Sequence, residues 1–240
     1  MADRRPAFYA AGGPLGDWWT ILHPPYTAWH LSYVAIGAAL APRLDAERLI
    51  ATLLAFFLAV GVAAHALDEL NGRPLRTSVP SGVLAAVAAI ALAGAVAIGL
   101  VGVTRVGVVL VPFVVVGAFL VAAYNLELLD GRFHTDAMFA AAWGSFPVLT
   151  AYVAQAERLG TPALLAAAAA YGLSRAQRSL SSSVRFVRRQ TNRVDVTLDL
   201  RDGGERRAHE EFLLDPPEAA LRTLSWALPV LAAALVVARI

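Results

Sequence analysis

Long apolar runs recur along this chain and limit what it can fold into. Four of them approach the roughly 20 residues that a helix needs to cross the hydrocarbon core of a bilayer. These runs lie at residues 49–64, 83–101, 106–124 and 137–154. Hydrophobic residues make up 58% of the sequence, more than is typical of soluble domains. We therefore predict an all-α fold, a polytopic transmembrane helical bundle.

Three weaker runs raise the predicted number of spans to about seven. Residues 26–41 and residues 223–238 form two of them. Residues 162–173 are followed by Arg175 and Arg178, so this run crosses only if both guanidinium groups reach a polar cavity or the interface. We predict four divisions of the chain. They are an interfacial segment (residues 1–24), a bundle of spans (25–189), a cytoplasmic loop (190–216) and a final transmembrane helix (217–240).

Two short segments outside the spans have patterns of their own. Paired tryptophans and prolines at residues 17–25 are typical of an interfacial helix or loop. Apolar and polar residues alternate from Val194 to Leu200, and Asp202-Gly203-Gly204 follows as a turn. This alternation predicts a small β-hairpin in the cytoplasmic loop.

Arginine supplies all the basic side chains, because the sequence has no lysine. Alternating seven spans places all the arginines on the N-terminal side except Arg43, Arg48, Arg105, Arg158 and Arg239. The positive-inside rule makes that side cytoplasmic, in an inner or plasma membrane. The charge therefore reflects topology and gives no indication of a nucleic-acid partner. No signal peptide is evident, so we expect the first span to direct insertion.

Polar residues gather at the predicted cytoplasmic helix ends. An apolar run ends in His65, Asp68 and Glu69, and residues three and four apart lie on one face of a helix. A similar cluster follows the apolar run at residues 106–124, beginning with Asn125. Histidine mixed with carboxylates suits Zn, Fe or Mn, whereas carboxylates alone suit Mg. The absence of cysteine excludes thiolate ligands. The predicted metal ligands are His65, Asp68, Glu69, Glu127, Asp130 and His134, of which His65, Asp68 and Glu127 are the catalytic candidates.

The arginines offer a partner for phosphate, since guanidinium groups bind its oxygens in pairs. The predicted anion-binding residues are Arg73, Arg76, Asn125, Arg175 and Arg178. The arginines from Arg185 to Arg193 are better explained as a flank that contacts anionic lipid. A simpler interpretation also remains open, in which acids and arginines at helix ends form ordinary ion pairs. His30, inside the first span, is either a core histidine or a ligand or proton carrier.

The order of these features resembles the UbiA superfamily of intramembrane prenyltransferases over roughly residues 20–180. The matching positions are His23-Pro24-Pro25, Gly72-Arg73-Pro74-Leu75, Ser81-Gly82 and the run at residues 142–155. The resemblance implies a bundle open to lipid, in which aspartate-rich motifs hold Mg²⁺ against a prenyl diphosphate. The first motif reads Ala64, His65, Asp68 and Gly72, so it keeps only Asp68. The second is replaced by residues 174–178, which contain no carboxylate.

Three hypotheses follow for the function. The first is a UbiA-like, prenyltransferase-type membrane enzyme that acts on a lipidic substrate, an isoprenoid or prenyl diphosphate, at a cytoplasm-facing metal site. The second keeps the bundle but binds Fe or Zn and oxidises or hydrolyses a lipid. The third is a non-catalytic protein that binds a lipid or a membrane partner. The sequence does not predict the oligomeric state.

Overall fold

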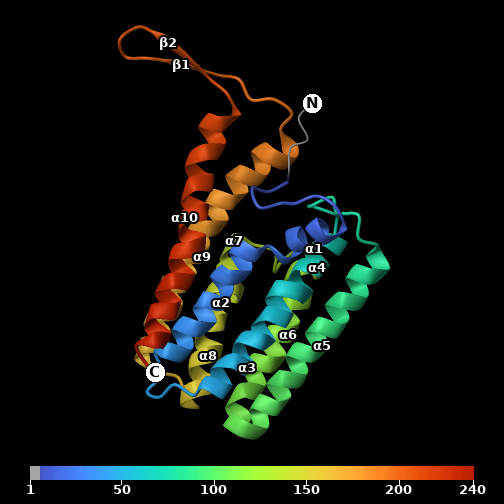
Figure 1. Cartoon of the computed structure of the whole chain (residues 1–240), viewed down its shortest axis with the longest axis vertical. Helices are drawn as coiled ribbons and strands as arrows, with labels where there is room; N and C mark the ends of the chain where they lie inside the picture. The colour runs from blue at the N-terminus through green and yellow to red at the C-terminus, as the bar shows by residue number, and fades with distance from the viewer. Residues whose placement is uncertain (1–5) are drawn as a thin grey trace.

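The computed structural model describes residues 6–240, so Arg4 and Arg5, which enter the predicted charge asymmetry, lie outside the described residues. The chain is a helical bundle with one small hairpin at its end (Figure 1). Its longer helical elements are α1 (Pro14–Leu22), α2 (Pro24–Ala39), α3 (Ala46–Phe56), η1 (Phe57–Ala64), α4 (His65–Leu70), α5 (Ser81–Val106), α6 (Val111–Asn125), α8 (Phe146–Ala156), α9 (Thr161–Arg185) and α10 (Glu210–Val237). The shorter elements are η2 (Val108–Leu110), α7 (Asp136–Ala140), η3 (Ala141–Ser145), η4 (Phe186–Gln190), β1 (Val196–Asp199) and β2 (Glu205–Ala208).

Within residues 6–240, five continuous helical stretches are long and apolar enough to cross a membrane. They are Ala46–Leu70, Ser81–Val106, Val108–Asn125, Asp136–Ala156 and Glu210–Val237. The prediction of an all-α bundle with helices that could span a membrane is thereby confirmed. Of the two other predicted spans, α2 has only 16 residues, and α9 carries arginines in its second half.

Both α2 and α9 nevertheless lie inside the bundle beside α8 and α10 (Figure 1). Trp29 and Tyr33 of α2 pack in one buried cluster with Val148 of α8 and Leu228 of α10. The contact between α2 and α8 is a backbone contact, because a Cβ at Gly37 would lie 2.3 Å from the carbonyl oxygen of Val148. Small residues allow such close approach between helices in membranes.

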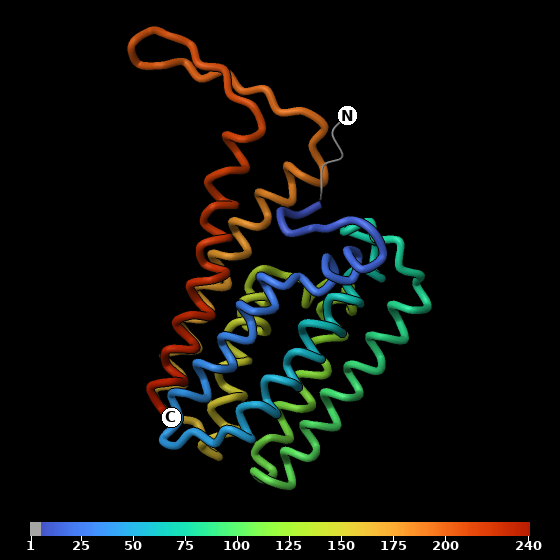
Figure 2. The backbone as a smooth tube through the Cα atoms, in the orientation of Figure 1, coloured from blue at the N-terminus to red at the C-terminus, as the bar shows by residue number. Residues whose placement is uncertain are grey.

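The helix ends form two groups at opposite ends of the bundle (Figure 2). At one end Arg48 donates to the carbonyl of Ala154, to the carboxylate of Glu157 and to the carbonyl of Arg105, and so joins α3, α8 and α5. At the other end Asp17 of α1 accepts from the backbone and hydroxyl of Ser78. That second end also carries α4, η4 and the hairpin (Figure 1).

The hairpin forms where alternation predicted a strand, with Val196 paired to Ala208 and Asp199 to Glu205 in antiparallel register. The final helix begins earlier than expected. The sequence predicts it at residues 217–240, but α10 begins at Glu210 and continues through Pro216 and Pro217. Each proline removes one backbone donor; the carbonyls left without these partners belong to Phe212 and Leu213, which are exposed.

Candidate functional site

A polar cavity of about 320 Å³ lies at the end of the bundle that carries α1, α4 and η4. Its walls come from α2, η1, α4, α6, η3, α9 and η4, together with the segment before α1. Four of the predicted metal ligands line it, namely His65, Asp68, Glu127 and His134. Asn125 lines it as well. Residues from two clusters far apart in the sequence therefore meet in one cavity.

The cavity histidines are oriented by the backbone. Each uses Nδ1 for a backbone carbonyl, which can only accept, so the neutral ring carries its proton on Nδ1 and a lone pair on Nε2. The pairs are His23 with Ile21 at 2.6 Å, His30 with Trp143 at 2.9 Å, His65 with Gly61 at 3.2 Å and His134 with Tyr124 at 3.1 Å.

Two of these rings lie face to face. The centroids of His23 and His65 are 4.4 Å apart, with an interplanar angle of 21°. Burial, and then the neighbouring imidazole of His65, lower the pKa of His23 well below its usual value. His23 is therefore neutral at pH 7, in agreement with its hydrogen bond to Ile21.

Glu69, a predicted metal ligand, does not reach the cavity. It is fully buried, and its carboxylate accepts from the backbone of Leu75 at 2.9 Å and from the backbone and hydroxyl of Thr77 at 2.8 and 2.7 Å. Successive residues of an α-helix are separated by about 100°. The cavity face is centred near Asp68, so Glu69 points to the loop after α4 and holds that loop in place.

Replacing Glu69 with alanine is expected to destabilise the fold by about 3 kcal/mol, because two amides and a hydroxyl lose a charged acceptor. In a chain of this size that lowers the melting temperature by roughly 10 °C, measurable in detergent by thermal unfolding. Glu47→Ala is the matched control, since Glu47 is 82% exposed at the opposite end of the bundle. An unchanged melting temperature with loss of bound metal would contradict this structural role.

Asp130, another predicted ligand, is exposed and does not line the cavity. Glu127, Leu129 and Asp130 all adopt left-handed backbone angles in the turn that leads to α7, and this turn directs the Asp130 side chain outward. Within the described part of the chain, no three histidine or carboxylate side chains converge closely enough to hold a metal ion.

The predicted anion-binding arginines also divide. Arg73 donates to the carbonyl of Val79 and to the hydroxyl of Ser81, so it organises the loop after α4. Arg76 is exposed. Arg175 is 45% exposed and lies 3.7 Å from Asp136, outside the cavity. Arg178 lines the cavity and donates to Asp136 at 2.9 Å.

Arg185 and Arg189 line the same cavity, although the sequence favoured contact with anionic lipid for both. At about 100° per residue, Arg178 and Arg185 of α9 lie within roughly 20° of one another on the helix, and Arg189 follows in the π-helical segment η4. Arg175 lies on the edge of that face. The spacing of seven and four residues was the signal in the sequence that could have identified them.

Three π-helical segments occur within residues 6–240, and all of them contribute to the cavity. Val60 and Ala64 come from η1, Trp143 from η3 and Arg189 from η4. A π-helical turn inserts an extra residue and rotates the following side chains, and such turns are frequent at functional sites. These segments therefore help to bring His65 and Arg189 to face the cavity.

The segment before α1 covers part of the cavity. Arg189 donates to the carbonyl of Pro6 at 3.2 Å, and the guanidinium of Arg222 lies 4.8 Å from the centre of the Phe8 ring. Tyr9 lines the cavity beside them. Burial, and then the neighbouring phenol of Tyr26, raise the pKa of Tyr9 well above its usual value, so its neutral hydroxyl can donate a hydrogen bond.

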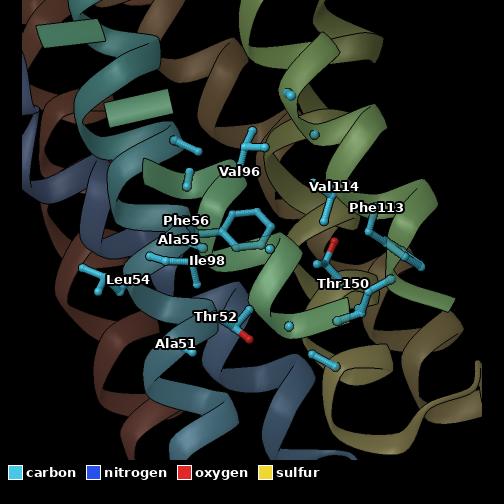
Figure 3. Close-up of a pocket in the computed structure, with 18 of the residues that line it drawn as sticks. Ala51, Thr52, Leu54, Ala55, Phe56, Val96, Ile98, Phe113, Val114 and Thr150 are labelled. Carbon is cyan, nitrogen blue, oxygen red and sulfur yellow. The ribbon is translucent and has the colours of Figure 1, made fainter. Parts of the chain in front are cut away.

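An apolar groove of about 630 Å³ lies next to the polar cavity, and Figure 3 shows part of its wall. The two share Val60 and Trp143 as wall residues. The groove runs along α3, α5 and α6 toward the Arg48 end of the bundle. Phe56 of α3 and Val114 of α6 are among its labelled wall residues in Figure 3.

Comparison of the chain with models of known protein families, with curated proteins and with solved structures finds no match to any of them.

Proposed function

We propose that the chain is an integral membrane enzyme that acts on an isoprenoid diphosphate in a UbiA-like, prenyltransferase-type reaction. The observation that carries this proposal is that a polar cavity and an apolar groove lie side by side, with Val60 and Trp143 in the walls of both. A diphosphate group suits a cavity lined by arginines, tyrosines and histidines, and the isoprenoid chain suits the groove.

The proposed topology has seven membrane passes. Five are the long apolar stretches described above; the other two are α2, which is short for a span, and α9, which is less apolar than the others. The two groups of helix ends at opposite ends of the bundle are compatible with this alternation. The positive-inside rule then turns the polar cavity toward the cytoplasm. Because α9 packs against α8 and α10, its arginines can enter the membrane region while facing the cavity instead of lipid.

The two sides of the cavity suit the two halves of a prenyl transfer. In the first half the allylic carbon–oxygen bond breaks, and its electron pair leaves with the diphosphate. Arg178, Arg185 and Arg189 stabilise that developing negative charge. In the second half a carbon–carbon bond forms to the acceptor, and the proton that the acceptor loses passes to the carboxylate of Asp68 or Glu127.

The test uses the purified full chain in mild detergent with radiolabelled farnesyl diphosphate and a membrane lipid extract as the acceptor. We expect release of diphosphate and a labelled lipid product, and mass spectrometry of the purified protein should detect retained isoprenoid lipid. Retained lipid without any turnover would overturn the enzymatic proposal and favour the non-catalytic binder.

A second candidate function is favoured by the four oriented histidines. A histidine that donates Nδ1–H to a carbonyl is arranged as metal-bound histidines are, with Nε2 available. An Fe or Zn enzyme that oxidises or hydrolyses a lipid would use them in this way. Elemental analysis of the purified protein separates the candidates, because stoichiometric Fe or Zn is expected only for the second.

A further inference from the structure

The α9 face of the cavity is the strongest unassigned feature. Arg178 and Arg185 of α9 and Arg189 of η4 all line the cavity. Arg185 is close enough to the other two to interact with them electrostatically. Like charges repel, so an anion bound between these groups would relieve the repulsion.

Two of the arginines near the cavity have a carboxylate partner within ion-pair distance, whereas Arg185 and Arg189 interact with the Asp68 carboxylate only at longer range. Arg188 forms an ion pair with Glu218, which is nearly fully buried. Arg178 pairs with Asp136. For Arg185 and Arg189, no carboxylate of residues 6–240 lies within ion-pair distance. The Arg185 guanidinium donates to the Ser182 hydroxyl, and the Arg189 guanidinium donates to the carbonyl of Pro6.

Two buried polar side chains that line the cavity, one on α6 and one on α9, also lack a partner. The Tyr124 hydroxyl and Oε1 of Gln177 form no hydrogen bond with any residue of the described chain, although the residues are only 4% and 2% exposed. Buried polar atoms nearly always have a hydrogen-bond partner in native proteins. The Tyr124 hydroxyl can donate to a phosphate oxygen, and the Gln177 carboxamide can donate its amide after rotation.

We infer that Arg185 and Arg189, with Arg178, Tyr124 and Gln177, form a binding site for the diphosphate of the lipid that works without a divalent metal ion. This inference rests on the proposed function and specifies how the head group is held. Guanidinium groups take the place of the carboxylate-bound Mg²⁺ that the UbiA resemblance implies. The cavity supplies cationic donors directly to phosphate oxygens, and such charge-assisted bonds are the stronger kind.

The experiment measures binding of farnesyl diphosphate to the purified full chain in detergent with excess EDTA, using tryptophan fluorescence, since Trp143 lines the cavity. We expect binding to persist in EDTA. Arg185→Gln and Arg189→Gln should each weaken it by roughly tenfold or more. Arg193→Gln makes the same change of charge at a side chain that is 82% exposed and paired with Asp195, and it should bind as the wild type does.

Two further probes distinguish this inference from the proposed function. Inorganic pyrophosphate reports on the head-group site alone, and farnesol reports on the groove alone. One outcome is that pyrophosphate binds in EDTA and needs Arg185, while farnesol does not bind and farnesyl diphosphate binds no more tightly than pyrophosphate. That outcome would support the anion site and overturn the isoprenoid function. If farnesol binds and pyrophosphate does not, the anion site is overturned and an isoprenoid-binding groove is supported.

The wild-type protein alone provides a decisive outcome that does not depend on the folding of any variant. If EDTA abolishes binding of farnesyl diphosphate and Mg²⁺ restores it, the arginine site is overturned. Wild-type affinity in Arg185→Gln would overturn it as well.

Discussion

Replacing Ala55 with tryptophan is expected to lower kcat/KM for geranylgeranyl diphosphate by about 100-fold while leaving pyrophosphate binding unchanged. Ala55 lines the apolar groove beside Phe56 (Figure 3). An indole in this place occupies the path of the isoprenoid chain, and overfilling an apolar site costs about 1–3 kcal/mol. The upper end of that range corresponds to a factor of about 100. Turnover of short and long prenyl diphosphates, compared side by side, measures the effect.

Ile90→Trp is the matched control, because Ile90 is 73% exposed on α5 and does not line the groove. It should retain the wild-type preference for chain length. Equal losses in both variants would indicate a general effect of tryptophan on the bundle. If Ala55→Trp turns over geranylgeranyl diphosphate as fast as the wild type does, the isoprenoid chain of the substrate does not bind in this groove.

The helical bundle could be predicted because apolar length is a property of each segment by itself. The run at residues 49–64 needs no partner to be recognised, and it lies inside the continuous stretch Ala46–Leu70. The start of α10 was misplaced because proline is favoured in the first turn of a helix, so Pro216 and Pro217 suggested a start at that point. Whether a helix also extends before them depends on tertiary packing, and Leu214 is buried against Val184 and Val187.

The site was harder to predict because it depends on rotation about helix axes and on turns. The sequence analysis grouped His65, Asp68 and Glu69 on one helix face. In the structure His65 and Asp68 line the cavity, whereas Glu69 accepts hydrogen bonds from the loop after α4. A π-helical segment directly before His65 changes the register in a way that no residue type indicates. Left-handed angles at non-glycine residues such as Asp130 are equally invisible in composition.

The charge on Asp68 is expected to be essential, so that Asp68→Asn lowers kcat by about 100-fold or more, the range of a lost general base. The Asp68 carboxylate lines the cavity without a hydrogen bond or ion pair to another side chain of residues 6–240, and it interacts electrostatically with Arg185 and Arg189. Asparagine keeps the shape of the side chain but can neither accept the proton nor stabilise the allylic cation. Turnover of saturating farnesyl diphosphate measures this loss.

Binding separates this role from that of the arginines. If Asp68 acts on the acceptor side, Asp68→Asn should keep the affinity for farnesyl diphosphate and the melting temperature, whereas Arg185→Gln should lose affinity. Asp199→Asn, an equivalent change on the exposed hairpin strand β1, should alter neither kcat nor affinity. If Asp68→Asn instead abolished Mg²⁺-dependent binding while kcat of the bound fraction was retained, the carboxylate would hold a metal against the diphosphate. In the first outcome the diphosphate is bound by the arginines, and in the second it is bound by a metal ion on Asp68. The variants Asp68→Asn and Arg185→Gln therefore decide between the two arrangements.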